Sequence, residues 1–238
     1  MNLELSKEDK RRRIKFPSKN KSLAEFFGII TGDGYIGQYK LSNRIVSNIE
    51  ISGNKIKDLD YMKDFVSSLI EELFNIRPNI YLRETDNTIR IIIYSKGIFI
   101  FLKNLGFPIG DKGNIIPPKW IVDNSEFLRV FVRGFFDTDG NLCFKNKYNK
   151  KYPVLSLASK SNDLLESIQK YLKLYEIPSY LGTHRANNSR YKKEVITHKL
   201  EINGKKNICL FFNYIGSNNL RNKLKYKEMC KIYGDGGI

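Results

Sequence analysis

Apolar residues recur at two spacings along this chain, and segments of the two kinds alternate. A spacing of three or four positions is typical of a helix, and a spacing of two is typical of a strand with one buried face. Helical spacing dominates residues 56–74, whose apolar positions are Ile56, Leu59, Met62, Val66, Leu69 and Leu73. Spacing by two is clearest at Ile89, Ile91 and Ile93, which lie in the segment TIRIIIYS. The chain therefore predicts a mixture of helices and sheets.

The predicted elements follow the same order in both halves: helix, two strands, helix, two strands, helix. The first half reads as a helix at 23–33, strands at 35–41 and 44–52, a helix at 56–74, strands at 79–84 and 88–95, and a helix at 97–105. The second half reads as a helix at 125–139, strands at 141–147 and 153–159, a helix at 161–175, strands at 179–186 and 194–202, and helices at 204–215 and 219–231.

This order predicts an α/β protein of the α+β kind, built from two αββαββα units related by a pseudo-two-fold axis, each with an antiparallel sheet. Residues 1–21, which are rich in Lys and Arg, form a basic N-terminal arm, either solvated or in contact with phosphates. The first repeat is assigned to 22–105 and the second to 124–238. The Gly- and Pro-rich start of 106–123 marks the linker between them.

One short pattern occurs in both repeats at the end of the first helix. FFGIITGDG contains Gly28, Asp33 and Gly34, and VRGFFDTDG contains Gly134, Asp139 and Gly140, each 106 residues later. Ser22 is the predicted N-cap of the first of these helices, and Gly34 its left-handed stop. Small residues four apart (Gly28 with Gly32, Gly134 with Thr138) would let the two helices approach closely.

The position of the two acids suggests a metal ion. A carboxylate in the last turn of a helix opposes the macrodipole, at a cost of about 0.3–1 kcal/mol. Two such carboxylates side by side would also repel each other, and a hard divalent cation relieves both problems. We therefore predict that Asp33 and Asp139 bind Mg²⁺, which Mn²⁺ or Ca²⁺ can replace for binding, with the carbonyls of Gly32 and Thr138 as further ligands. The alternative is that the acids merely end their helices.

Charge indicates the class of partner. The formal net charge is +16 with a pI near 9.6, and both halves of the chain are basic. An extended polyanion such as nucleic acid is the expected partner, and an ordinary basic protein is the alternative. The three cysteines are far apart and neither histidine lies near one of them in the sequence, which argues against a zinc site and favours a reducing interior. No secretory signal or membrane-length apolar run is evident, so we expect an intracellular protein of the cytoplasm or an organelle matrix.

FFGIITGDG and VRGFFDTDG resemble the paired signature of LAGLIDADG homing endonucleases, in their single-chain form with two motifs. The resemblance covers nearly the whole chain. It implies that Asp33 and Asp139, at the eighth motif position, are the metal-binding acids. The sixth position is often acidic too; Asp137 matches it and Thr31 does not, which should leave catalysis intact because this position is not the essential ligand.

The resemblance also implies a fold and a reaction. Members act as monomers on long asymmetric sites in double-stranded DNA, and two sheets form a saddle along the major groove. They hydrolyse one phosphodiester in each strand across the minor groove and leave short 3′ overhangs. Lys160 and Asn54, each 21 residues after a motif acid, match a position where the family carries a basic or amide residue that positions solvent or balances phosphate charge. Asn54 has a capping role as its alternative, and Lys55 stands beside it.

Strand alternation predicts which side chains face DNA. Leu155, Leu157, Ile80, Leu82, Ile89, Leu142 and Leu200 mark the core side of their strands. The outward candidates are Gln38, Lys40, Tyr81, Arg83, Arg90, Tyr94, Lys145, Lys147, Ser156 and Lys199.

Two alternatives keep the same fold and change the activity. One is a maturase, an RNA-binding splicing cofactor, which loss of a motif acid would have favoured. The other is a non-catalytic DNA-binding regulator, which would be expected to lack the acids and to carry a separate helix-turn-helix. Both acids are present, so an endonuclease for intron homing is the preferred interpretation. Intein splicing motifs are not evident, and a free-standing protein is the simpler expectation.

Overall fold

The computed structural model describes residues 5–147, 150–188 and 193–234. The chain forms two compact units. The first comprises Met1–Lys112 and Pro118–Thr138, and the second comprises Gly113–Pro117 and Asp139–Ile238. The helix that opens the second sequence repeat therefore packs mainly with the first unit, and the structural boundary falls at its end.

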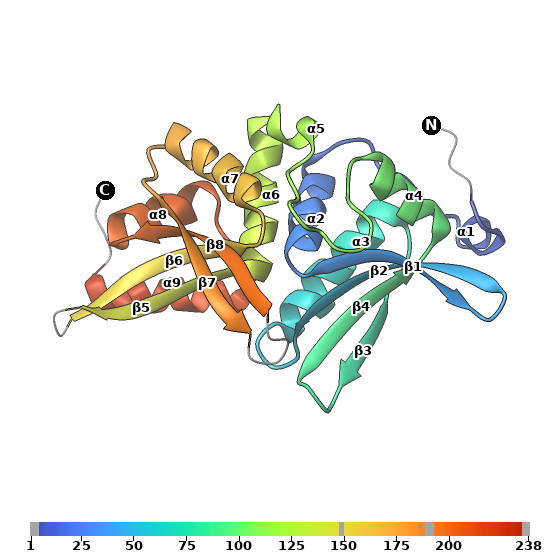
Figure 1. The fold of residues 1–238 in the computed structure, drawn as a ribbon, viewed down its shortest axis with the longest axis horizontal. Helices are drawn as coiled ribbons and strands as arrows, with labels where there is room; N and C mark the ends of the chain where they lie inside the picture. Colours follow the sequence, from blue (N-terminus) through green and yellow to red (C-terminus); the bar gives the residue numbers. More distant parts are fainter. Residues whose placement is uncertain (1–4, 148–149, 189–192, 235–238) are drawn as a thin grey trace. The chain divides into compact units, whose positions relative to one another are not determined.

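The first unit contains a four-stranded antiparallel sheet with the order β1-β2-β4-β3. Helices α2, α3 and α4 lie along one face of it (Figure 1). Its strands are β1 (Gly34–Leu41), β2 (Arg44–Asn54), β3 (Asn79–Arg83) and β4 (Thr88–Tyr94). Its helices are α1 (Lys7–Arg11), α2 (Lys21–Gly32), the π-helical turn η1 (Tyr61–Val66), α3 (Ser67–Phe74), α4 (Lys96–Asn104), α5 (Lys119–Val122) and α6 (Ser125–Asp139).

The second unit repeats this sheet topology. Its order is β5-β6-β8-β7, which is the order of the first sheet with every strand replaced by its counterpart. The strands are β5 (Gly140–Lys147), β6 (Lys150–Ser159), β7 (Tyr180–Asn188) and β8 (Lys193–Asn203), and the helices are α7 (Asn162–Leu174), α8 (Lys205–Tyr214) and α9 (Leu220–Tyr233). The identical order confirms the predicted duplicated α+β fold.

Strand alternation identified most of the core correctly. Ile89, Ile91 and Ile93 are at most 1% exposed, and Leu155, Leu157 and Leu200 are fully buried. The exception is β3, where the expected core residues Ile80 and Leu82 are 39% and 46% exposed. β3 is the edge strand of its sheet, and every one of its residues is exposed. Alternation therefore carries little information there.

The ends of α2 differ from the prediction in two details. Asn20, and not Ser22, is the N-cap, and its side-chain oxygen accepts a hydrogen bond from the Leu23 amide at 2.8 Å. Gly34 does not adopt the left-handed conformation and instead opens β1. An added Cβ at Gly34 would lie 2.4 Å from the Cα of Ile30, so this glycine is required by close packing.

The single helix predicted at 56–74 begins later and has two parts. The Asn54 side chain accepts hydrogen bonds from the amides of Ile56 and Lys57, and the Asp58 carboxylate accepts one from the Asn54 amide. These contacts stabilise a turn in place of the first helical turn. The helix then starts at Leu59 and passes into the π-helical turn η1 at Tyr61.

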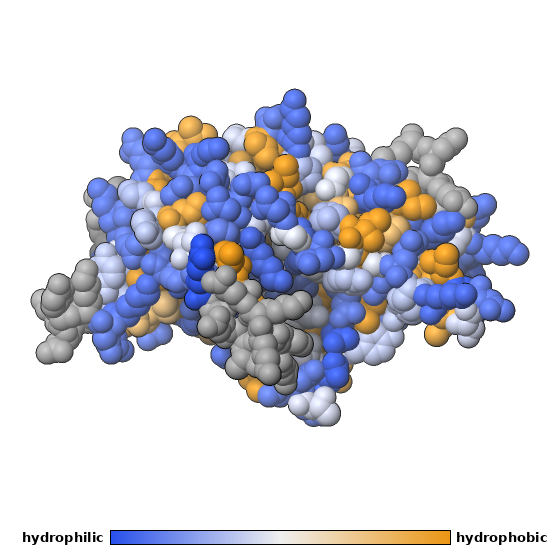
Figure 2. All heavy atoms as spheres, viewed as in Figure 1, coloured by the Kyte–Doolittle hydropathy of each residue, from blue (hydrophilic) through white to orange (hydrophobic). Residues whose placement is uncertain are grey.

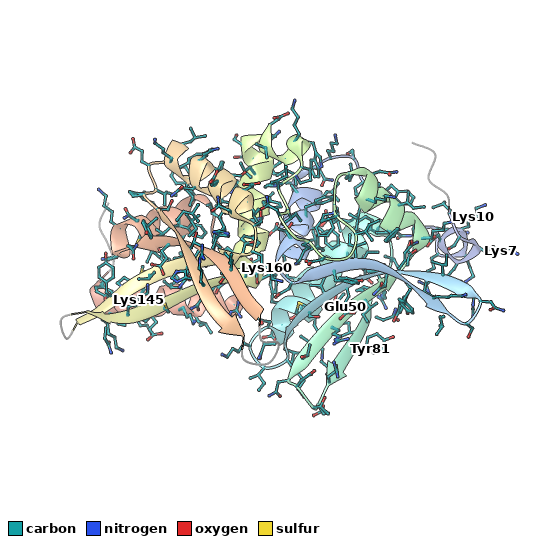
Figure 3. The ribbon with its side chains drawn as sticks, viewed as in Figure 1. Lys7, Lys10, Glu50, Tyr81, Lys145 and Lys160 are labelled. Atoms are coloured by element: carbon teal, nitrogen blue, oxygen red, sulfur yellow. The ribbon has the colours of Figure 1, made fainter. Side chains whose placement is uncertain are left out.

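The basic N-terminal segment is docked and not a solvated arm. The Asp9 carboxylate on α1 is 1% exposed and accepts hydrogen bonds from the Ser95 hydroxyl at 2.7 Å and the Gly97 amide at 3.0 Å. An added Cβ at Gly97 would lie 2.7–3.1 Å from atoms of Leu5, Ile14 and Phe16, so the segment packs tightly on α4. Its cations, Lys7 and Lys10 among them (Figure 3), remain exposed.

The linker contains the short helix α5, which attaches it to the first unit. The Trp120 ring lies edge-on to the rings of Phe27 and Phe127, with centroids 5.3 and 5.9 Å apart. Within the described residues, no helix combines the length and apolarity needed to cross a membrane. Polar residues cover most of the face drawn in Figure 2, with apolar residues scattered among them.

We predict that Asp9→Asn lowers the free energy of unfolding by about 1.5–3 kcal/mol at pH 7, because a buried carboxylate that accepts several hydrogen bonds is replaced by an amide. Burial would raise the pKa of Asp9, but hydrogen bonds from Ser95, Ser6 and Gly97 offset this and hold the pKa below its usual value. The stabilisation of the fold by the Asp9 carboxylate is therefore present above about pH 4. It is lost as the pH falls through the lowered pKa of Asp9.

Urea denaturation of wild type and Asp9→Asn at pH 7 and at pH 3 measures the difference in their free energies of unfolding. This difference should shrink in acid. Glu8→Gln, at a neighbouring acid that is less buried, serves as the control and should change stability little. Equal stability of Asp9→Asn and wild type at pH 7 would contradict the anchoring role.

Candidate metal centre and nucleic-acid interface

Helices α2 and α6 cross at two glycines, and the contact is reciprocal. An added Cβ at Gly28 would lie 2.1 Å from the carbonyl oxygen of Phe131 and 3.0 Å from the Phe135 amide nitrogen. An added Cβ at Gly134 would lie 2.4 Å from the carbonyl oxygen of Glu25 and 3.0 Å from the Ile29 amide nitrogen. Each contact maps onto the other by a shift of 106 residues. The crossing therefore has a local two-fold character, and only glycine fits at its centre.

Each helix carries its motif acid five residues beyond the crossing glycine. Asp33 is the half-buried C-cap of α2; its amide donates to the Ile29 carbonyl at 3.2 Å, and its carbonyl accepts from the Ser52 amide at 3.1 Å. Asp139 is the exposed last residue of α6. The backbone on each side of the Asp33 side chain is thus fixed by α2 and β2.

A buried ionic group lies along the α2–α6 contact. The Arg133 guanidinium donates to both oxygens of Glu25, at 2.8 and 2.6 Å, and Glu25 is 5% exposed. The hydrogen bonds to Glu25 raise the pKa of Arg133. Asp137, at the sixth motif position, is 1% exposed. Close packing and charge pairing thus act on the same interface.

Tyr61 faces this group of acids. It is 4% exposed, and its hydroxyl makes no hydrogen bond to the described residues. Burial raises the pKa of Tyr61 well above its usual value, and the charges of Asp137, Glu25, Asp33 and Asp58 raise it further. The phenol therefore stays neutral next to the motif acids.

Sequence reasoning missed one residue at the end of α2. The Lys112 ammonium donates hydrogen bonds to the main-chain carbonyls of Thr31, at 2.8 Å, and Gly32. The Gly32 carbonyl, a predicted metal ligand, thus accepts a hydrogen bond from a lysine in this structure. Two glycines with positive φ, Gly110 and Gly113, flank Lys112 in the linker. These two glycines were the signal in the sequence that the chain turns on both sides of Lys112.

Asn54 and Lys160 end equivalent strands. Asn54 is the last residue of β2, and its side-chain oxygen caps the turn that follows. Lys160 is exposed between the end of β6 and Ser161, the N-cap of α7 (Figure 3). The neighbouring Lys55 ammonium lies 3.1 Å from the Glu84 carboxylate. The two positions correspond in the fold, but Asn54 lies within β2 and caps a turn, whereas Lys160 lies one residue beyond β6.

The first sheet has an outward face rich in tyrosine. Tyr39, Tyr81 and Tyr94 lie on it; burial raises the pKa of Tyr94, and the neighbouring phenols of Tyr39 and Tyr81 raise it further. Arg90 lies 3.3 Å from the carboxylate of Glu50, which sequence reasoning overlooked, and Arg83 lies 3.1 Å from Asp86. Figure 3 labels Glu50 and Tyr81 on this sheet.

The face predicted for Gln38 and Lys40 is wrong. β1 pairs with β2 in an unbroken register, so Gln38 and Lys40 lie on the same side of β1 as the core residue Ile36. The Gln38 amide donates to the Ser47 hydroxyl at 2.9 Å on that side. β1 is exposed on both sides beyond Gly37, and this exposure weakened the alternation signal.

The outward face of the second sheet carries a charge cluster centred on one acid. The Lys145 and Lys199 ammonium groups lie 2.8 and 3.0 Å from the same oxygen of Glu201. Burial would raise the pKa of Glu201, but the two lysines lower it overall. Ser156, predicted to contact DNA, is only 6% exposed. The side chain of Lys147 lies outside the described residues.

A family model decides the classification. Residues 126–216 match the model of the LAGLIDADG-like domain. The chain contains a LAGLIDADG-like domain. This confirms the resemblance predicted from the two motifs. The match starts in α6 and covers most of the second repeat. The first repeat lies outside the match and shares the strand order of the second.

Curated relatives match only in part of their own length. A replication factor C small subunit from Methanocaldococcus jannaschii is 29% identical over 187 residues, which cover 73% of this chain but 10% of that protein. A tRNA-splicing ligase RtcB from Pyrococcus furiosus is 26% identical over 214 residues, 82% of this chain and 21% of that protein. This chain thus corresponds to a minor segment of these relatives.

Solved structures share the fold over whole chains. I-DmoI in complex with DNA and calcium superposes with a TM-score of 0.59 at 19% identity, covering 87% of this chain and all of the other. The LAGLIDADG homing endonuclease I-LtrWI, bound to target DNA, gives 0.58 at 15% identity, with 90% and 91% covered. I-DmoI complexes with manganese and magnesium also match.

The residues present fit a hard divalent cation of the kind that the LAGLIDADG signature implies. No three His, Cys, Asp or Glu side chains gather into a metal-binding group in the described parts of the chain. Magnesium ordinarily needs only one or two protein carboxylates, with phosphates and water completing its shell. The C-terminal carbonyls of α2 already attract a cation, Lys112, so this helix end suits a positive charge.

We predict that Gly28→Ala destabilises the protein by about 2 kcal/mol, because the added methyl group forces the helix backbones apart. The better helix propensity of alanine returns up to about 1 kcal/mol and is included in this value. Gly53→Ala is the control, since its added Cβ would meet only the flexible Met62 side chain, at 3.3 Å. Urea denaturation compares the three proteins. A Gly28→Ala variant as stable as Gly53→Ala would contradict the close crossing.

Proposed function

We propose that this protein is a site-specific double-strand DNA endonuclease that hydrolyses one phosphodiester in each strand and leaves short 3′ overhangs. The observation that carries the proposal is the reciprocal crossing of α2 and α6, because it gives Asp33 and Asp139 equivalent positions at the ends of two paired helices. The LAGLIDADG-like domain and the fold shared with DNA-bound homing endonucleases support it.

The relatives add a second line of support. Their names describe unrelated activities, a replication factor subunit and an RNA ligase, yet both contain a segment similar to this chain. A segment shared by proteins of unrelated function is expected to carry an activity of its own. A mobile-element endonuclease is such an activity, and homing is its biological role in this proposal.

In the proposed reaction Asp33 and Asp139 hold divalent metal, preferentially Mg²⁺, with the main-chain carbonyls of Gly32 and Thr138 as candidate further ligands. Bound metal would activate water and stabilise charge on the scissile phosphate and the leaving oxygen. The α2 cap and the Ser52 hydrogen bond hold Asp33 in place. Lys160 and Asn54 would act on solvent or phosphate in this reaction.

The outward faces of the two sheets supply the DNA contacts in this proposal. Arg83 and Arg90 can read base edges or bind phosphate, and Lys145 and Lys199 are suited to phosphate. Tyr81 and Tyr94 add uncharged donors and apolar surface. A single chain with two unequal sheets suits a long asymmetric site.

We predict that Asp33→Asn and Asp139→Asn each abolish double-strand cleavage, with a rate loss of about a thousandfold or more, because each removes a charged metal ligand. The substrate is a plasmid with the uninterrupted junction of the host gene, incubated with Mg²⁺ or with EDTA. Asp64→Asn, at an exposed acid of η1, should cleave like wild type. Tight binding of intact junction DNA by wild type without any cut in Mg²⁺ would reject the endonuclease and favour a maturase or a regulator.

We also predict that Glu201→Gln tightens binding to random-sequence duplex DNA about threefold or more at low salt, because Lys145 and Lys199 are released toward phosphate. The slope of log K against log salt should become more negative by about 1 to 2. Fluorescence anisotropy at several salt concentrations measures both quantities. Glu166→Gln removes the same charge from α7, which covers the other face of the sheet, and should have little effect. Equal changes in the two variants would place the DNA elsewhere.

A further inference from the structure

The linker contributes a cation to the end of α2. The ammonium of Lys112, which is half-buried, donates to the carbonyls of Thr31 and Gly32, the last two residues before Asp33. Carbonyls in the last turn of a helix have no partners within the helix and form the negative end of the macrodipole. A lysine at this position satisfies two of them and offsets the unfavourable placement of the Asp33 carboxylate.

A hydrogen bond and two glycine turns hold the backbone on either side of Lys112. The Gly110 amide donates to the carbonyl of Ile36 on β1 at 2.8 Å, two residues before the lysine. Gly110 and Gly113 have φ of +80° and +47°, conformations that favour glycine. The linker thus turns on both sides of Lys112 and is attached to the strand that follows Asp33.

The second repeat does not contain this turn. Gly216, with φ of +72°, directly follows Ile215, the C-cap of α8, and so matches Gly106, which follows Leu105, the C-cap of α4, 110 residues earlier. At that offset Lys112 corresponds to Asn222, which lies within α9. The turn that carries Lys112 therefore belongs to the linker after the first repeat.

We propose that Lys112 is a resident cation of the first motif, which holds the Gly32 carbonyl and weakens divalent-ion binding at Asp33. This inference rests on the proposed metal centre. A divalent ion that used the Gly32 carbonyl would lie a few ångströms from the ammonium, and the repulsion between the two charges opposes its binding. Metal at Asp33 therefore relies on the carboxylate and on substrate phosphate.

The test measures metal binding by the DNA-free protein, with Tb³⁺ luminescence as the probe. Lys112→Met should bind Tb³⁺ about fivefold more tightly than wild type, because a nearby like charge is removed and a carbonyl ligand is released. Its melting temperature in EDTA should fall, since the helix end loses its cation. Lys119→Met removes the same charge from the exposed α5 position in the same linker and should change neither quantity. Lys112→Arg, which keeps the charge, should retain wild-type affinity.

The two hypotheses fail in different ways. If Asp33→Asn weakens Tb³⁺ binding but Lys112→Met and Lys119→Met bind equally, the metal centre stands and the role of Lys112 is rejected. If Asp33→Asn leaves Tb³⁺ binding unchanged, the proposed centre is rejected and the inference falls with it. Tighter binding by Lys112→Met together with wild-type affinity in Lys112→Arg supports the resident cation.

Discussion

The close crossing of α2 and α6 is the constraint from which the rest of the candidate site follows. Two helix backbones can approach this closely only where side chains are absent, and Gly28 and Gly134 provide that at the same point on each helix. Because the contact is reciprocal, each helix carries its motif acid at the same distance along the chain from its glycine. In the proposed centre the motif acids gain their equivalence from this packing. A duplicated sequence alone would not give it, since two copies of a motif can fold without contact.

Ion pairs act on the same helix crossing and on the outward faces of the two sheets. The crossing sequesters Glu25 with Arg133 and keeps Tyr61 neutral beside the acids. The outward faces of the sheets follow a similar rule, because Glu50 and Glu201 hold Arg90, Lys145 and Lys199 in place. Acids that hold cations in an extended arrangement reduce the entropy that binding must remove. In the proposed complex, phosphate would have to compete for each of these cations.

How much of this the sequence could predict depends on whether the signal was local. Helix α6 was predicted with its observed limits, and the Ile89–Ile93 core by alternation, because burial on one face dictates residue type directly. The Ile80 and Leu82 assignments failed at an edge strand, where neither face is covered. Gln38 and Lys40 failed for a related reason, since one side of the projecting hairpin no longer has a core to specify it. The docking of Asp9 on Ser95 and Gly97 joins residues more than 80 positions apart, and no local pattern announces such a contact.

The candidate site shows the same division between pattern and context. The spacing of 106 residues identified both acids, because duplication leaves a periodic trace that survives in one sequence. Lys112 left no such trace, because it lies in the linker between the repeats and no lysine stands 106 residues after it. Only the fold shows that its ammonium donates hydrogen bonds to the carbonyls of Thr31 and Gly32 at the end of α2. A single chain is free to make its two halves unequal, as a symmetric dimer is not. A lysine on one helix end is a small change by which one motif can come to bind metal differently from the other.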